Sequence, residues 1–372
     1  MSIFKEIERK DHEQVVFCSD KKSNLRAIIA IHNTTLGPSL GGTRMWTYAS
    51  SEEALADALR LSRGMTYKAS VAGLNLGGGK AVIIGDPNKD KNESLFRAYG
   101  RFVEGLAGRY ITAEDVGTSV RDMEWVRMET KYVTGIDRAL GGGGDPSPVT
   151  AFGVYHGMKA AVRQLTGNDS LKGKKVAVQG AGQVAGFLCD HLAKEEAKIF
   201  VTDIFEEKAR KVAGRTKATY VPPEKIYDVD ADVFCPCALG AILNDDTIPR
   251  LKAKIIAGGA NNQLADEKKH GQMLLRKRII YAPDYAINAG GLISVANELE
   301  GYPRERALKQ AEGIYDTILR IFEIASAEKI PTYEASNRLA EERITRLGHI
   351  RNLYASKSEF VGRLGDLDHS RR

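Results

Sequence analysis

Apolar and polar positions along this chain follow two periods, and the two periods predict alternating helices and strands. Ser50-Ser-Glu-Glu53 is a capping box, and the apolar positions after it, from Leu55, have helical spacing. A second helical pattern covers 92–107. Short apolar runs predict strands at 81–84 and 110–115, the second ending in a carboxylate. The first part of the chain is therefore predicted to be α/β.

The second part of the chain alternates more strictly. A helix is expected from near Thr150, followed by a strand at 175–179, a helix to about Lys194 and a strand at 199–202. Further strands are expected at 233–235, 255–257 and 279–281. Such alternation predicts a parallel, doubly wound sheet. From about Gly291 the pattern is mostly helical, with one helical part over 304–329 and another from Pro331 through Leu347 to Tyr354.

The clearest break in the chain is the segment 141–148, Gly-Gly-Gly-Gly-Asp-Pro-Ser-Pro. Four glycines and two prolines cannot continue a regular element, so a hinge or crossover is expected there. A chain of 372 residues is also too long for one ordinary core. We therefore predict two α/β domains that meet at residues 148 and 149.

Composition narrows the class of protein. Hydrophobic residues make up 43% and charged residues 27%, as in soluble globular proteins, and the net charge of +6 is spread over the chain. We expect no nucleic-acid partner, no signal peptide and no membrane span. The four cysteines favour a reducing, cytoplasmic location. No metal site is expected, because Cys235-Pro-Cys237 lacks a second cysteine or histidine pair and the seven histidines are scattered.

Candidate chemistry begins with two lysines, Lys68 and Lys80, set among glycines and small apolar residues. A lysine deprived of water has a lowered pKa and can act as a general base. The ordinary alternative is a pair of solvated lysines beside a flexible loop, but three glycines directly before Lys80 favour close backbone approach. A nucleotide-phosphate loop is excluded, since Leu74 and Ala81 replace its first glycine and its magnesium-binding hydroxyl.

A dinucleotide-binding fingerprint follows the strand predicted at 175–179. Gly180 permits a tight turn, Gly182 allows the backbone to meet a pyrophosphate, and Ala185 takes the third small position. Asp203 ends the next strand, 23 positions after Gly180, where it can bind the adenosine ribose hydroxyls. A glycine-rich turn without a ligand is the alternative, but the complete unit favours a cofactor. The expected cofactor contacts are Gly180, Gly182, Gln183, Val184, Ala185 and Asp203.

With both lysines, Asp115 and the fingerprint, the chain resembles the family of glutamate, leucine, phenylalanine and valine dehydrogenases, most closely the members that act on leucine. The resemblance covers nearly the whole chain from about Phe17, and its motifs are at 37–46, 65–80, 112–117, 146–150 and 281–291. It implies a catalytic and oligomerisation domain at 1–148, completed by a C-terminal helix over 331–372. It also implies a Rossmann-type NAD-binding domain at 149–330 and a cleft between the two domains that opens and closes.

The resemblance also assigns roles. It implies that Lys68 binds the substrate α-carboxylate with help from the backbone at Gly41 and Gly42. Lys80 is implied as the catalytic lysine, and Asp115 as the carboxylate that assists proton transfer. Residues implied to contact the nicotinamide end or the substrate are Thr150, Asn262 and Asn288. An aliphatic side-chain pocket is expected from Leu40, Ala113, Leu292 and Val295, of which Leu40 and Val295 stand where glutamate dehydrogenases have a lysine and a serine. The four-glycine run and Ala286 depart from the family pattern.

The chemistry is consistent with these residues. A hydride leaves the substrate Cα for nicotinamide, and water then attacks the resulting iminium while a base removes its proton. Lys80, kept neutral by Lys68 and the closed cleft, is the expected base, and Asp115 relays protons. We predict NAD-dependent, reversible oxidative deamination of branched-chain L-amino acids to 2-oxo acids and ammonia, by a homo-oligomer that the resemblance implies is an octamer. Valine or phenylalanine as preferred substrate, or a non-catalytic NAD-binding regulatory protein, are the alternatives.

Overall fold

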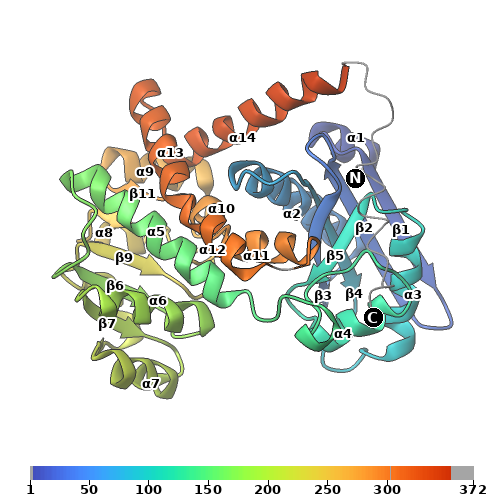
Figure 1. Cartoon of the computed structure of the whole chain (residues 1–372), viewed down its shortest axis with the longest axis horizontal. Coiled ribbons are helices and arrows are strands. Elements are labelled where there is room, and N and C mark those ends of the chain that lie inside the picture. Colours follow the sequence, from blue (N-terminus) through green and yellow to red (C-terminus); the bar gives the residue numbers. More distant parts are fainter. Residues whose placement is uncertain (1–2, 302, 353–372) are drawn as a thin grey trace.

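The computed structural model describes residues 3–301 and 303–352. Two α/β units lie side by side, each built on one sheet, and helices of the C-terminal part lie between and above them (Figure 1). The predicted fold class is therefore confirmed. Sheet A is formed by the first part of the chain and sheet B by the second.

Sheet A has five strands in the order β1-β2-β4-β3-β5. β1 and β2 are antiparallel, as are β2 and β4, whereas β3 is parallel to both β4 and β5. Apolar side chains of α2 cover one face, and those of α3 and α4 cover the other. The elements of this unit are α1 (Ile3–Arg9), β1 (Gln14–Asp20), β2 (Leu25–Asn33), β3 (Ser39–Trp46), α2 (Ser51–Val71), β4 (Gly77–Ile84), α3 (Glu93–Glu104), β5 (Tyr110–Glu114), α4 (Val120–Arg127) and the 3-10 turn Arg138–Leu140.

The start of α2 and the extent of β4 follow from local contacts. Ser50 caps α2 as expected, since its side chain accepts a hydrogen bond from the backbone N–H of Glu53 at 3.2 Å. β4 begins at Gly77, earlier than the predicted residue 81. A Cβ on Gly77 would lie 2.0 Å from the Asn33 carbonyl oxygen, and one on Gly78 would lie 2.1 Å from the Thr66 nitrogen. The glycines are therefore part of the strand and let β2 and α2 approach it closely.

Sheet B is parallel throughout, as predicted, with the order β11-β10-β9-β6-β7-β8. α5 begins at Ser147, before the expected Thr150, because Pro148 is tolerated in a first helical turn, where its missing N–H has no intrahelical partner to lose. The short β8 was not expected. The elements are α5 (Ser147–Thr166), β6 (Lys175–Gln179), α6 (Gln183–Lys194), β7 (Lys198–Thr202), α7 (Glu206–Thr216), β8 (Thr219–Tyr220), the 3-10 turn Pro223–Asp228, β9 (Val233–Pro236), α8 (Thr247–Arg250), β10 (Ile255–Ile256), α9 (Glu267–Arg276) and β11 (Ile280–Tyr281).

The C-terminal helices return the chain toward sheet A. The helix predicted over 304–329 is divided at Gly313, and Tyr354 lies outside the described residues. The last long helix, α14, packs on α2, where the Ser70 hydroxyl donates to the Ala340 carbonyl at 2.8 Å and Tyr67 donates to Glu341 at 2.6 Å. These helices are α10 (Asp284–Ile287), α11 (Gly290–Glu298), α12 (Arg304–Glu312), α13 (Ile314–Glu328) and α14 (Thr332–Gly348), followed by the 3-10 turn His349–Asn352.

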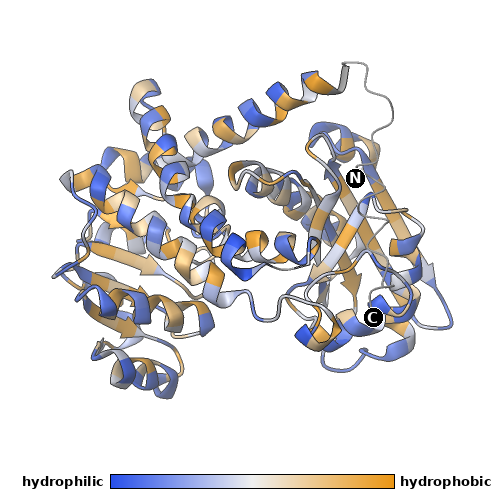
Figure 2. Cartoon of the chain, in the orientation of Figure 1, coloured by the Kyte–Doolittle hydropathy of each residue, from blue (hydrophilic) through white to orange (hydrophobic). Residues whose placement is uncertain are grey.

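Hydrophobic residues concentrate in the strands and on the helix faces that cover them (Figure 2). The largest apolar cluster joins α5, α6 and the strands of sheet B to α11, α13 and α14, and it includes Leu40 of β3. The two units therefore share part of one core. Among the helices that the structure describes, none is both long enough and apolar enough to cross a membrane.

Candidate active site

One face of sheet A collects most of the side chains expected in the catalytic site. Leu40 pairs with Gly78, and Gly42 pairs with Ala113. Because side chains alternate along a strand, Leu40, Gly42 and Arg44 share this face with Lys80 and Ala113. α2 covers the same face, since a Cβ on Gly78 would collide with the α2 backbone. The predicted residues Leu40, Ala113, Lys80 and Lys68 are thus brought together between the sheet and α2.

Lys80 and Asp115 form the central pair of this site. The side chain of Lys80 is 6% exposed, and its Nζ lies 2.9 Å from Asp115 Oδ2. Burial lowers the pKa of Lys80, and the attraction of Asp115 partly offsets that effect. Burial also tends to raise the pKa of Asp115, but the cations of Lys80 and Arg44 outweigh it and hold that pKa below its usual value. The geometry suits a lysine that exchanges a proton beside a carboxylate that stays ionised.

Lys68 belongs to α2, and its pKa is lowered as well. Burial lowers the pKa of Lys68 to about 8, with Asp284 opposing and the Lys80 cation adding to the shift. For Lys80, burial is the main cause of the lowered pKa, and Arg44 is the nearby cation that contributes. Of the two causes expected for a neutral Lys80, the Lys68 cation and the exclusion of water, burial is the larger influence on the pKa of both lysines.

Arg44 and Asp57 are site residues that the sequence reasoning missed. Arg44 Nε donates to Asp115 Oδ2 at 3.0 Å, and its Nη1 donates to Asp57 Oδ2 at 2.9 Å. Arg44 lies two residues beyond Gly42, so the alternation of side chains along β3 was the signal that could have placed it beside Lys80. Asp57 comes from α2, and no local pattern connects it to β3.

Asp284 is a second residue without an assigned role, and it faces Lys68. It accepts hydrogen bonds from the backbone N–H groups of Gln263 at 2.8 Å and Tyr285 at 2.6 Å. Burial raises the pKa of Asp284 above its usual value, against the pull of those bonds and of Lys68. This carboxylate therefore connects the loop after β10 to the α2 side of the site.

The residues expected near the nicotinamide end lie on that loop and at the adjoining helix ends. Asn288 Nδ2 donates to the Gly259 carbonyl at 3.1 Å and to Asn261 Oδ1 at 2.6 Å. Its Oδ1 is buried and has no hydrogen-bond partner in the part of the chain that the structure describes. Asn262 has a left-handed backbone, with φ of 50°, and Thr150 sits in the first turn of α5, where its hydroxyl donates to the Pro146 carbonyl at 3.0 Å.

The four residues expected to line the side-chain pocket are placed as follows. Leu40 and Leu292 are buried members of the largest apolar cluster, and Val295 packs against it from the same helix as Leu292. Ala113 is 8% exposed and lies on the sheet face that carries Lys80, outside that cluster. The two strand residues therefore lie on the sheet face that carries Lys80, and the two helical residues lie on α11.

The glycine turn between β6 and α6 has the local geometry that a fingerprint requires. Gly180 has φ of 109°, and a Cβ there would lie 2.8 Å from the Cys237 carbonyl oxygen. Gly182 caps α6, and nothing lies within 4 Å of where its Cβ would be. Gln183 and Val184 open the helix and Ala185 is buried beneath it. Asp203 Oδ2 accepts from the backbone N–H of Ala181 at 2.8 Å, so the carboxylate lies beside the turn.

A glycine turn on a parallel sheet, next to a second sheet that carries a buried lysine–carboxylate pair, is the arrangement of the amino-acid dehydrogenases, oxidoreductases that act on a CH–NH₂ group. A model described as the dimerisation domain of Glu/Leu/Phe/Val dehydrogenases matches residues 12–132. The model of Glutamate/Leucine/Phenylalanine/Valine dehydrogenase matches 141–205 and 195–346. The chain belongs to this family, as the sequence motifs indicated.

Individual relatives are similar over almost their whole length. The leucine dehydrogenase of Thermoactinomyces intermedius is 63% identical, over 95% of this chain and 96% of its own. That of Geobacillus stearothermophilus is 60% identical, over 97% and 98%. The crystal structure of L-tryptophan dehydrogenase from Nostoc punctiforme superposes with a TM-score of 0.84 at 51% identity, over 93% of this chain and 99% of its own.

Proposed function

We propose that this protein catalyses the reversible, NAD-dependent oxidative deamination of leucine, isoleucine and valine to the 2-oxo acids and ammonia. The observation that carries the proposal is the buried Lys80–Asp115 pair, 2.9 Å apart, on a sheet face that also presents Leu40 and Ala113. The identity of 63% with a leucine dehydrogenase supports the same substrate class. Since the family is one of enzymes, the non-catalytic alternative is not retained.

Each site residue has a role in this reaction. Lys68 binds the substrate α-carboxylate together with the backbone at Gly41 and Gly42, because an ammonium group attracts a carboxylate and backbone N–H groups can donate to it. Lys80, whose pKa burial lowers, takes the proton from the water that attacks the substrate carbon. Asp115 remains ionised, receives hydrogen bonds from Lys80 and offsets positive charge that develops on the substrate nitrogen.

The residues beside sheet B fit a dinucleotide. The positive φ of Gly180 and the open space at Gly182 permit backbone contact with a pyrophosphate at the start of α6, where Gln183, Val184 and Ala185 follow. Thr150, Asn262 and Asn288 hold the nicotinamide end, and the unpartnered Oδ1 of Asn288 is an acceptor suited to an amide N–H. When bound, the nicotinamide accepts the hydride from the substrate Cα.

NAD rather than NADP is the proposed cofactor. Asp203 lies where a ribose 2′-hydroxyl would bind and where a 2′-phosphate would be repelled. The nearest downstream arginine, Arg210, is engaged elsewhere, with Glu206 at 2.6 Å and over the Tyr220 ring at 4.6 Å. We expect kcat/KM to favour NAD clearly, and comparable values for both cofactors would contradict the assignment of Asp203.

Substrate choice is proposed to depend on the aliphatic pocket of Leu40, Ala113, Leu292 and Val295. A glutamate γ-carboxylate would enter it without a partner, at a cost of several kcal/mol. Each buried methylene of a branched aliphatic substrate would instead gain roughly 0.8 kcal/mol. Phenylalanine is ranked below leucine because Leu292 narrows the pocket. A size step of this kind gives about 1–3 kcal/mol of discrimination, so valine and aromatic substrates remain the second candidates.

A single assay tests the proposal. NADH formation is followed at fixed NAD with leucine, isoleucine, valine, phenylalanine, tryptophan and glutamate, and kcat/KM is compared. We expect leucine to lead and glutamate to be inactive. The absence of turnover with all three branched amino acids would contradict the proposed function, and a preference for tryptophan or phenylalanine would replace it with an aromatic one.

The packing of the C-terminal helix also supports limits for the two domains. We propose a catalytic domain of 1–148 with 331–372, supported within the described residues by the packing of α14 on α2, and a cofactor domain of 149–330.

A homo-oligomer, with eight subunits as the expected number, is supported by the dimerisation-domain match and by the open edge strand β1, where Phe17 is 52% exposed. Four free cysteine thiols support a cytoplasmic location. Light scattering of the purified protein measures the subunit number.

A further inference from the structure

Asp115, the carboxylate of the proposed catalytic pair, is the first member of a longer chain of charged contacts. Its Oδ2 receives Lys80 Nζ at 2.9 Å and Arg44 Nε at 3.0 Å. Arg44 then extends past Asp115, and its Nη1 donates to Asp57 Oδ2 at 2.9 Å. The planar guanidinium thus holds two carboxylates in a fixed relation, which a flexible single ammonium cannot do.

Asp57, on α2, connects Arg44 of β3 to a side chain on the surface of α2. Its Oδ2 also accepts from the Tyr48 hydroxyl at 2.9 Å, and its Oδ1 accepts from Arg60 Nη2 at 2.8 Å. The Asp57 side chain is 17% exposed, whereas that of Arg60 is 53% exposed. Exposed ion pairs contribute little to folding stability, so the Arg60–Asp57 contact is poorly explained as a stabilising device.

Arg60 reaches the other unit of the molecule. Its Nη1 donates to Asn262 Oδ1 at 3.5 Å, across 202 residues of sequence. The Asn262 backbone is itself held in the sheet B unit, because its carbonyl accepts from the Ala241 N–H at 2.7 Å and the next residue, Gln263, donates to Asp284. A continuous series of contacts therefore connects this loop to Arg60 and, through Asp57, to Arg44.

We propose that Arg44 and Arg60 are positioning residues. They couple the position of the loop after β10, which contains Asn262, to the orientation of the Asp115 carboxylate. When the two units are together, Arg60 bridges Asn262 and Asp57, and Arg44 is thereby held against Asp115. The inference rests on the proposed function, since it assigns Asp115 to the reaction and Asn262 to the cofactor side of the site. It adds a connection between them that neither residue makes directly.

The coupling also has an electrostatic side. The groups that face Lys80 are Asp115 after β5, Arg44 on β3, and Asp57 and Lys68 on α2, with Asp284 facing Lys68 from α10. Arg44 is a cation that lowers the pKa of Lys80 and holds that of Asp115 down. Loss of the Arg44 charge should therefore raise both pKa values, whereas a lysine at this position, which retains the charge, should leave the pKa of Lys80 lowered.

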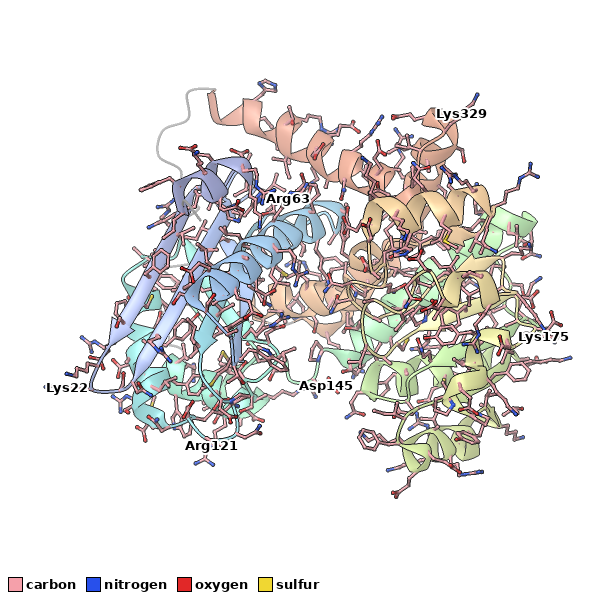
Figure 3. All side chains as sticks on the ribbon, turned by 180° about the vertical axis from the view of Figure 1, so that it is seen from behind. Lys22, Arg63, Arg121, Asp145, Lys175 and Lys329 are labelled. Atoms are coloured by element: carbon pink, nitrogen blue, oxygen red, sulfur yellow. The ribbon has the colours of Figure 1, made fainter. Side chains whose placement is uncertain are left out.

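The first test separates the bridge from a structural role. Arg60→Met retains the aliphatic part of the side chain and removes the guanidinium group. Arg63→Met, on the same helix, is the matched control. Arg63, labelled in Figure 3, donates to the Tyr67 hydroxyl at 2.9 Å and stacks on that ring. We expect Arg60→Met to lower kcat about five- to tenfold and to weaken NADH binding, with leucine KM within about twofold, and Arg63→Met to match the unmodified enzyme.

A double-mutant cycle completes this test. Asn262→Ala and the double variant Arg60→Met/Asn262→Ala are compared with the single variants in kcat and in the Kd of NADH. If the two side chains act as one contact, the double variant loses no more than the larger single loss. Independent, multiplying losses, or an Arg60→Met enzyme equal to the unmodified one, would overturn the coupling.

The second test addresses Arg44. Arg44→Lys retains the positive charge but lacks the planar guanidinium that contacts two carboxylates at once. We therefore expect kcat to fall tenfold or more, while the pH at which the rate rises on the alkaline side stays the same. Arg44→Met should in addition move that rise to higher pH. If Arg44→Met fails to fold, Arg44→Lys still decides, because a near-normal kcat would refute the positioning role. An unmodified enzyme without leucine-dependent NADH formation would instead refute the proposed function.

Discussion

The two sheets carry their polar groups in different places. In sheet A, Lys80 and Arg44 project from within strands, with side-chain exposures of 6% and 20%, and each is paired with a carboxylate. In sheet B the central strands β6 and β9 have buried apolar interiors, and the polar groups follow the strand ends, as Gly180 does after β6 and Asp203 after β7. Buried charged side chains need a partner of opposite charge to be tolerated, whereas a turn at a strand end offers backbone N–H groups that can bind an anion without any charged side chain.

The difference indicates how each site can fail. The sheet A site depends on particular side chains and on their burial, so a substitution there acts on the reaction. The sheet B site depends on backbone shape, so a substitution there acts on folding or on cofactor affinity according to where a Cβ would point. The expectations below test this contrast from the largest effect to the smallest.

The largest effect is expected at Lys80. Lys80→Ala removes the proposed base and should lower kcat on the order of 10²- to 10⁴-fold, with NADH binding nearly intact. The matched control is Lys91→Ala, which breaks another lysine–aspartate pair of the same unit, at 2.6 Å from Asp122. That variant should lose stability and retain turnover. Steady-state kinetics and NADH fluorescence titration measure both quantities, and a Lys80→Ala enzyme with near-normal kcat would contradict the assigned role.

A charge introduced into the aliphatic pocket should have the next largest effect. Leu40→Lys combined with Val295→Ser is expected to lower kcat/KM for leucine about 100-fold or more, because a buried charge without a partner costs several kcal/mol. The same variant should gain measurable turnover of glutamate. Leu40→Met, which conserves volume, is the control and should stay within about tenfold of the unmodified enzyme. Glutamate turnover by the unmodified enzyme at a rate near that of leucine would disprove the pocket assignment.

The two glycines of the turn should separate folding from binding. Gly180→Ala is expected to destabilise the protein by about 1–3 kcal/mol, because the backbone has φ of 109° and the new Cβ would meet the Cys237 carbonyl. Gly182→Ala meets no neighbouring atom, so its melting temperature should be unchanged while NADH affinity falls about tenfold. Thermal unfolding and NADH titration of both variants are the measurements. Equal NADH affinity for Gly182→Ala and the unmodified protein would place the pyrophosphate elsewhere.

The smallest effect on activity is expected at two histidines beneath α2, whose burial makes stability depend on pH instead. His12 Nε2 lies 2.8 Å from the Ser62 hydroxyl, and His32 Nδ1 lies 2.8 Å from that of Thr66. Burial lowers the pKa of His12 to about 4 and that of His32 to about 3. In the unfolded chain both histidines bind a proton below about pH 6.5, whereas in the folded chain His12 stays neutral down to about pH 4 and His32 to about pH 3. The contribution of the two histidines to stability is therefore complete above about pH 6.5 and is lost as the pH falls from about 6.5 toward these values.

Urea unfolding at about pH 7.5 and about pH 5 measures this dependence. We expect each histidine to account for about 2 kcal/mol of the loss between these conditions. His12→Gln, which cannot titrate, should show a loss smaller by about that amount, with activity at pH 7.5 retained. An unaltered pH dependence in this variant would show that other groups govern stability in this range.

How far the sequence predicts the structure differs between the two sheets. In sheet B the strand–turn–helix unit of 175–194 and the acidic residue at 203 were predicted correctly, because each is specified by neighbours within a few residues. In sheet A the carboxyl-ended strand and the paired lysines were anticipated, but not β4 starting at Gly77. The division of the last long helical stretch at Gly313 was also missed, because one glycine is tolerated within a helix pattern.

The sequence by itself determined the period of each element, the glycine turn, and the residue types that belong to an amino-acid dehydrogenase, because these depend on local chemistry and spacing. The tertiary structure alone decided that Arg44 meets both Asp115 and Asp57, and that Arg60 reaches Asn262, 202 residues away. It also decided that burial is the main cause of the lowered pKa of Lys80. Contacts and desolvation of this kind arise from the packing of distant segments, which no local pattern encodes.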